Sequence, residues 1–164
     1  NGLKTNVFNE ERELNIVIAF MLSGSLHFGS VKFKQEVAIE IMALLAFSAL
    51  KNDNRLQTLF FDKKIEKFFE PTKNDTIVYQ LVDNAVSFDC LGREVDYQAF
   101  CDFINGVVRQ KSLIFMVGDF YGDIDLSQIA HKNEVYAIIV RDRLEENPNL
   151  NGEFELVDTN TLSS

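Results

Sequence analysis

The chain has 164 residues, which fits one domain of ordinary size with a substantial hydrophobic core. Apolar residues make up 46% of it and its net charge is −9, with no run of basic residues interleaved with aromatic ones. Because nucleic-acid binding depends on basic groups that neutralise phosphates, this charge argues against a nucleic-acid partner. No apolar run reaches the roughly 18 residues that a membrane-spanning helix needs, so no membrane segment is predicted in this chain.

The chain begins with Asn1 rather than Met, and we expect one domain over residues 1–164 that is a piece of a longer protein. No secretory signal is visible at its start. The two cysteines, Cys90 and Cys101, lack neighbouring His or Cys residues at metal-site spacing. Two buried thiols in a reducing compartment are the simpler interpretation, and a disulfide between them stays open. We therefore expect a cytoplasmic location.

The first predicted element is a buried strand over residues 13–22, because its apolar run is continuous rather than alternating. A turn with the sequence Ser23-Gly24-Ser25 follows, and apolar residues then recur at helical spacing from Val37 to Lys51. Residues 56–61 and 65–69 are predicted as two strands joined by a tight turn, which makes an antiparallel hairpin.

Two further helices are predicted after the hairpin. Thr72 and Asp75 resemble a capping box in front of a helix over residues 77–85. Asp96 is predicted to cap a second helix, whose apolar residues extend to Val108.

The last part of the chain returns to strands. Residues 112–117 and 135–140 are predicted as core strands with a short helix around Ile129 between them, and residues 152–157 could add an edge strand. Strands that alternate with helices through short connections predict an α/β fold. We expect a Rossmann-like three-layer sandwich with a mainly parallel central sheet, one antiparallel hairpin strand and helices on both faces.

Two segments are expected to meet at one edge of this sheet. In parallel sheets, ligands bind at the carboxyl ends of the strands, near the point where the strand order reverses. The turn at 23–25 and the segment 118–125 each follow a core strand, so both are expected there. A cation-binding turn of this kind needs Asp-x-Ser-x-Ser, together with a Thr from a distant loop and an Asp at another strand end. Hard cations such as Mg²⁺ prefer oxygen ligands of these types.

Several short motifs follow one another along nearly the whole chain: FNEEREL (8–14), SGS (23–25), FG (28–29), EVA (36–38), LLAFSAL (44–50), NDNR (52–55), EKFFEP (66–71), GDF (118–120) and NEVYA (133–137). Their order and spacing resemble a von Willebrand factor A-like domain. The resemblance is strongest to the bacterial domain-of-unknown-function group of such proteins, often encoded beside MoxR-type AAA ATPases.

The resemblance implies a remnant of the metal-ion-dependent adhesion site of that family. Ser23, Ser25 and Asp119 match expected ligands, whereas Met21 replaces the first Asp and Val95 replaces the Thr. A thioether is a soft, weak ligand for a hard cation. No cofactor is therefore expected, with Mg²⁺ at low affinity as the alternative. The two serines could equally cap the backbone of the turn, as serine often does.

Three hypotheses follow for the function. The leading one is a non-catalytic protein-interaction domain, an adaptor or scaffold with a degenerate metal site, and the family context implies a MoxR-type AAA ATPase as its partner. The first alternative is a weak Mg²⁺ site on Ser23, Ser25, Asp119 and Asp123 that grips a carboxylate of a partner. The second is a metal-assisted phosphoryl-transfer enzyme that uses Asp119, Asp123 and Asp125.

Other catalytic patterns have little support in the sequence. A Ser/His/Asp site that includes His27 would lack both the Gly-x-Ser-x-Gly turn and an oxyanion loop. The glycines form neither a Gly-x-Gly-x-x-Gly nor a Walker pattern, so nucleotide binding by this domain is not expected. We therefore expect that the domain is not an enzyme.

Overall fold

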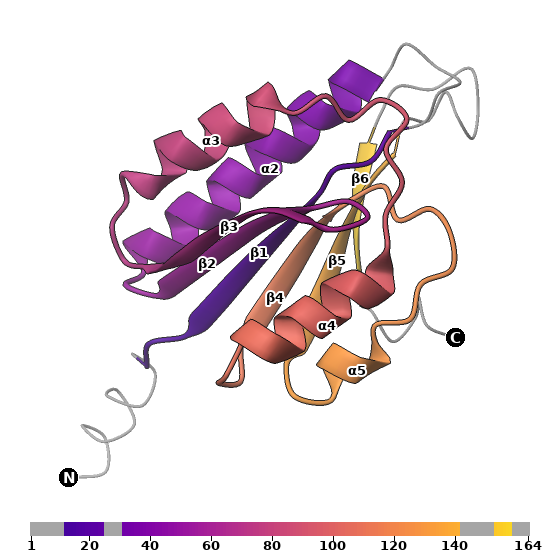
Figure 1. Ribbon diagram of the computed structural model, residues 1–164. Coiled ribbons are helices and arrows are strands. Elements are labelled where there is room, and N and C mark those ends of the chain that lie inside the picture. The colour runs from indigo at the N-terminus through magenta and orange to yellow at the C-terminus, as the bar shows by residue number, and fades with distance from the viewer. Residues whose placement is uncertain (1–11, 25–30, 142–152, 159–164) are drawn as a thin grey trace, which may run out of the picture.

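The structure, a computed structural model, describes residues 12–24, 31–141 and 153–158. A twisted central sheet has helices on both of its faces (Figure 1). Within the described residues the sheet has six strands in the order β3-β2-β1-β4-β5-β6. They are β1 (Asn15–Met21), β2 (Arg55–Phe61), β3 (Ile65–Thr72), β4 (Leu113–Gly118), β5 (Glu134–Arg141) and β6 (Glu153–Asp158).

The four central strands are parallel and the two edge strands are antiparallel to their neighbours. The predicted hairpin of β2 and β3 is confirmed, and so is the strand near the end of the chain. The expectation of one antiparallel strand was incomplete, because β6 is a second. Residues 142–152 separate β5 from β6, and a connection of this length favours an antiparallel neighbour over a parallel crossover.

Helices α2 (Val31–Lys51) and α3 (Ile77–Ser87) cover one face of the sheet, whereas α4 (Tyr97–Val107) and α5 (Ser127–Ala130) cover the other (Figure 1). Both faces of β1 are buried, and alternate residues join two different core clusters. Those under α2 and α3 are Ile16, Ile18 and Phe20, with Leu22 just after the strand, and those under α4 and α5 are Val17, Ala19 and Met21. The predicted three-layer sandwich is therefore confirmed.

Two predicted boundaries differ from the structure. Helix α2 begins at Val31, six positions before the predicted start at Val37. Strand β3 continues through Thr72, whose hydroxyl accepts a hydrogen bond from the amide of Asn74. The predicted capping box of Thr72 and Asp75 was therefore wrong: α3 begins at Ile77 after Thr76, which makes no side-chain cap bond.

The start of α4 is as predicted. Asp96 precedes the helix with an extended backbone, and its carboxylate accepts a hydrogen bond of 3.0 Å from the amide of Ala99. Such a bond satisfies one of the amides that a helix start leaves without an intrahelical partner. The cap fixes the start of α4, the helix that covers β1 and β4 on the face of the sheet opposite to α2 and α3.

The strand order reverses between β1 and β4. From β1 the chain continues to β2 and β3 on one side, and it later returns to place β4 and β5 on the other. The carboxyl ends of β1 and β4 therefore flank the position where ligand sites of parallel sheets form.

Candidate functional site at the ends of β1 and β4

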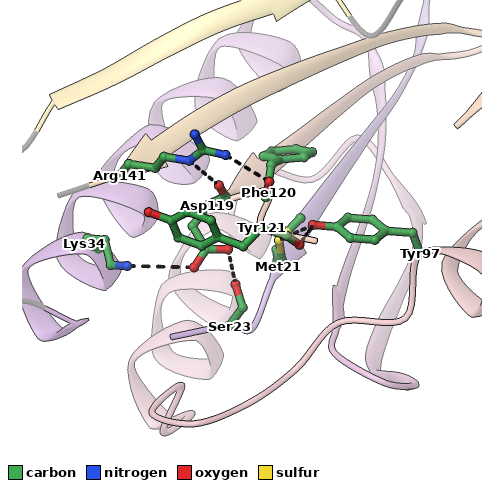
Figure 2. Close-up of polar contacts among 8 residues, drawn as sticks. All are labelled: Met21, Ser23, Lys34, Tyr97, Asp119, Phe120, Tyr121 and Arg141. Atoms are coloured by element: carbon green, nitrogen blue, oxygen red, sulfur yellow. Dashed lines mark hydrogen bonds and ion pairs between the residues drawn. The ribbon is translucent and has the colours of Figure 1, made fainter. Parts of the chain in front are cut away.

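Ser23 and Asp119 lie at the ends of these two adjacent strands. The amide of Leu22 donates to the carbonyl of Phe61 at 2.7 Å, which extends the pairing of β1 beyond Met21 and sets the position of Ser23. Asp119 directly follows β4. The hydroxyl of Ser23 donates a hydrogen bond of 2.6 Å to Oδ1 of Asp119 (Figure 2). The structure thus brings these two residues together, as the sequence predicts.

The second carboxylate oxygen of Asp119 faces a lysine from α2. Nζ of Lys34 lies 3.8 Å from Oδ2 of Asp119, and both side chains are only 7% exposed (Figure 2). A carboxylate this deeply buried requires a compensating charge or hydrogen bonds. Since Ser23 donates to one oxygen and Lys34 faces the other, both oxygens of Asp119 have partners inside the protein.

Met21 fills the strand end where the family resemblance places an aspartate. The side chain is buried, and a Cβ added to Gly118 would lie 2.5 Å from the Cβ of Met21. Glycine is therefore required at the end of β4 for the two strands to pack this closely. The sulfur of Met21 also lies 3.7 Å from the hydroxyl of Tyr97. This position is closed by packing and supplies no oxygen ligand.

Tyr97 links α4 to the loop after β4. Its hydroxyl donates to the carbonyl of Tyr121 at 3.1 Å (Figure 2). Burial raises the pKa of Tyr97, and the negative charge of Asp119 raises it further, while Arg141 has the opposite effect. Tyr97 therefore keeps its proton at neutral pH, as its role as a hydrogen-bond donor requires.

Arg141, the last residue of β5, holds the same loop from another side. Its Nε donates to the carbonyl of Asp119 at 2.8 Å, and its Nη2 donates to the carbonyl of Phe120 at 3.0 Å (Figure 2). Phe120 has a φ of 54°, a left-handed conformation that bulky residues rarely adopt. The two bonds to Arg141 stabilise the backbone on both sides of this residue.

Tyr121 presents an aromatic ring at this edge. The guanidinium carbon of Arg141 lies 4.5 Å from the ring centre and Nζ of Lys34 lies 5.8 Å from it. Both distances are typical of cation–π contacts. The side chain is nevertheless 43% exposed, so a held aromatic ring faces solvent beside the buried Asp119.

Val95 lies in a different depression from Asp119. It is half-buried against the core under α4, just before the cap at Asp96, and it lines a depression of about 470 Å³. The cavity lined by Ser23 and Asp119 has about 20 Å³. The position where the resemblance places a threonine ligand therefore contributes methyl groups to the wall of another depression.

The acidic residues that follow Asp119 do not join it. Asp125 accepts a hydrogen bond of 3.0 Å from the amide of Ser127, and bonds from the hydroxyl and amide of Ser127 lower the pKa of Asp125. Asp123 and Asp125 line the depression that contains Val95. Over the described ranges, which include all three aspartates, no group of three or more Asp, Glu, His or Cys residues could hold a metal ion. Asp119 therefore lines a different cavity from Asp123 and Asp125.

Ser25 and His27 lie outside the described residues. The role of Ser25 as a remnant ligand stays a prediction, together with that of Ser23 and Asp119.

Sequence reasoning missed Lys34, Tyr97, Tyr121 and Arg141. A signal for the first was present, because Lys34 lies one helical turn before Ala38 in a row of buried positions four apart. The row continues with Met42 and Ala46. A lysine on the core-facing side of a helix must find a partner, and the strand ends supply one.

The comparisons with known proteins agree with this fold. The model of a family described as "Protein of unknown function DUF58" matches residues 2–163. The chain belongs to this family. None of the curated proteins compared with it matches. In the part of this DUF58 chain that the structure describes, no helix is both long and apolar enough to cross a membrane.

Solved structures resemble this DUF58 domain at low sequence identity. The conserved hypothetical protein BatB from Bacteroides thetaiotaomicron has a TM-score of 0.56 and 10% identity, over 91% of this chain and 83% of its own. An aerotolerance-related membrane protein from Bacteroides fragilis has a TM-score of 0.56 and 13% sequence identity, over 92% of this chain and 84% of its own. The type V pili tip protein Mfa5 from Porphyromonas gingivalis has a TM-score of 0.52 and 12% sequence identity, and this chain spans only 20% of the length of that structure. At sequence identities this low, the structural similarity shows a shared fold alone.

Proposed function

We propose that this DUF58 domain is a non-catalytic protein-interaction module, an adaptor or scaffold that binds its partner through the carboxyl end of the sheet. The observation that supports this most is the internal pairing of Asp119 with Ser23 and Lys34. A carboxylate held in this way is poorly placed to act as a general base or to accept a metal ion. The most conspicuous acidic group of the edge thus has a structural role.

The exposed ring of Tyr121 supports the choice of surface. Tyrosine is enriched at protein interfaces because it offers a large contact area with few rotatable bonds. Here Tyr97 holds the backbone of Tyr121, and Lys34 and Arg141 lie near its ring. A ring that is already ordered loses little entropy when a partner covers it.

The proposed partner is a MoxR-type AAA ATPase, and this part rests on the family resemblance. A cytoplasmic site of action suits both the partner and the two free, buried thiols of Cys90 and Cys101. We do not propose an enzymatic function, because Asp119, Asp123 and Asp125 are not grouped.

The test is calorimetric titration of a purified MoxR-type ATPase from the organism that encodes this protein into this protein, in a buffer that contains EDTA. Binding is expected, and Tyr121→Ala is expected to weaken it about tenfold, the loss typical of a central interface residue. Tyr79→Ala is the matched control, since Tyr79 is 77% exposed on α3, which begins at the opposite edge of the sheet. Absence of binding would reject the partner, and equal affinities of the two variants would reject the surface.

The competing hypothesis is a weak Mg²⁺ site on Ser23, Ser25 and Asp119, with Asp123 as a further ligand. The closeness of Ser23 and Asp119 favours it. It predicts heat of binding when Mg²⁺ or Mn²⁺ is titrated into the isolated protein, and partner binding that EDTA abolishes. The interaction module proposed above predicts neither.

A further inference from the structure

We propose that the ammonium group of Lys34 takes the place of the metal ion at the ends of β1 and β4, so that the site is built to work without a metal. This inference deepens the proposed function. It rests on that proposal for the statement that a partner binds at this edge of the sheet. The inference concerns the charge of the site, and its test needs no partner.

Asp119 already has partners inside the protein. Its side chain is 7% exposed, as is that of Lys34, and its two oxygens face the Ser23 hydroxyl and the Lys34 ammonium. A divalent cation bound to the same carboxylate would come within a few ångströms of the ammonium group. Like charges this close and this poorly solvated repel strongly. The fixed cation and a metal ion therefore exclude each other.

The cavity at these strand ends is too small for a hydrated metal ion. The cavity lined by Ser23, Lys34 and Asp119 has about 20 Å³, room for about one water molecule. Mg²⁺ requires near-octahedral coordination and usually retains several water ligands. With Lys34 in its wall, the space that remains leaves no room for a hydrated ion.

The chemistry of the donor groups around the site also disfavours a metal ion. Met21 offers a thioether that packs against Gly118, and Val95 offers methyl groups to a separate depression. The carbonyl of Asp119 already accepts a hydrogen bond from Arg141. Hard cations prefer oxygen over thioether ligands, so the donors present do not fit Mg²⁺. They do fit an ammonium group, which needs only acceptors around it.

The placement of Lys34 shows how the fold supplies this cation. Its position on α2 continues the buried row of Ala38, Met42 and Ala46, which packs against the sheet. The helix therefore carries the positive charge to the ends of β1 and β4 whenever it packs in its native position. A metal ion would be gained or lost with its concentration, whereas this cation is present in every folded molecule.

The first experiment is a double-mutant cycle of Lys34→Met, Asp119→Asn and the two combined, followed by thermal unfolding in EDTA. Each single change removes one member of a charge pair whose side chains are only 7% exposed, so each is expected to lower Tm by about 10 °C. The double variant is expected to lose clearly less than the sum of the two single losses. Additive losses would overturn the proposal.

The second experiment asks whether Lys34 excludes metal. The Met21→Asp variant places a carboxylate at the end of β1, next to Gly118 and Asp119, and circular dichroism checks that it folds. With Lys34 in place it is expected to bind Mn²⁺ at least tenfold more weakly than the same variant with Lys34→Ser added. Equal Mn²⁺ affinities would overturn the proposal, as would a clear rise in the Tm of the wild-type protein with Mg²⁺ or Mn²⁺.

The outcomes separate this inference from the proposed function. If Lys34 and Asp119 are coupled but Tyr121→Ala binds the ATPase like the wild type, the proposed function fails and the inference stands. If Tyr121→Ala weakens binding in EDTA but the cycle is additive, the inference fails and the proposed function stands.

Discussion

Two strand ends of this domain carry a nearly buried aspartate paired with a cation, and they differ in what surrounds the pair. Asp119 follows β4 and faces Lys34 at 3.8 Å, with both side chains 7% exposed. Asp62 follows β2 and accepts a 2.7 Å bond from Arg93, with the two side chains 11% and 30% exposed. Both aspartates directly follow a core strand. Asp119 follows β4, which lies beside β1 at the reversal in strand order, whereas Asp62 follows β2, on the other side of β1.

The Asp62 pair is part of the framework of the fold. Its other oxygen accepts from the amide of Lys64 in the hairpin turn, and its carbonyl accepts from the amide of Asp96 at the start of α4. The acceptor atoms of Asp62 therefore connect the hairpin turn to the segment before α4. An acidic residue at a strand end is therefore not evidence of a ligand site, and the position of Asp119 beside β1 is what distinguishes it.

The difference in exposure predicts a difference in cost. Asp119→Ala removes the carboxylate that faces Lys34 in a nearly closed environment, and we expect a loss of about 3–5 kcal/mol in the free energy of unfolding. Asp62→Ala leaves Arg93, which is already 30% exposed and can gain water. There we expect about 1.5–3 kcal/mol, the range for hydrogen bonds to charged groups. Urea denaturation measures both, and an equal or reversed order would contradict the comparison.

Packing at the end of β4 predicts the next largest effect. Gly118→Ala would place a Cβ 2.5 Å from that of Met21, and neither atom can move without the backbone. We expect a loss of about 1–3 kcal/mol in the free energy of unfolding, the usual cost of overpacking.

Gly106→Ala is the matched control for Gly118→Ala. Gly106 lies within α4, and a Cβ there would meet nothing within 4 Å. Alanine should stabilise the helix by about 0.4–1 kcal/mol, because glycine loses more backbone entropy on folding. If Gly118→Ala is as mild as the control, the close packing of Met21 at this edge does not hold.

Much of this architecture can be predicted, because it follows from local patterns in the sequence. The continuous apolar run of β1 indicates burial on both faces, and its alternate residues do join two separate clusters. The meeting of Ser23 and Asp119 also follows, since a parallel sheet brings its carboxyl ends to one edge. The start of α2 could not be placed correctly, because apolar periodicity only becomes regular from Val37 onward.

The charge balance of the site could not be predicted from local patterns. Lys34 and Asp119 are far apart in the sequence, and their contact depends on α2 crossing the sheet above β4. Arg141 reaches the same loop from β5. These contacts follow from the strand order rather than from any spacing of residues. The missing ligands at Met21 and Val95 are visible in the sequence, whereas the group that compensates for them is visible only in the fold.

The smallest expected effect is the acid sensitivity of the Asp62 pair. Burial raises the pKa of Asp62, but the bonds from the Lys64 amide and from Arg93 outweigh it and lower the pKa below the ordinary 3.8. The unfolded chain therefore binds this proton first as the pH falls. The advantage of the wild type over Asp62→Asn should be about 1 kcal/mol at pH 6 and should decline as the pH falls below 3.8, toward the folded pKa. Urea denaturation between pH 6 and pH 3 measures this difference, with the exposed Asp83→Asn as the control for lost surface charge. An advantage that grows toward acid pH would show that Arg93 does not hold the carboxylate in its ionised form.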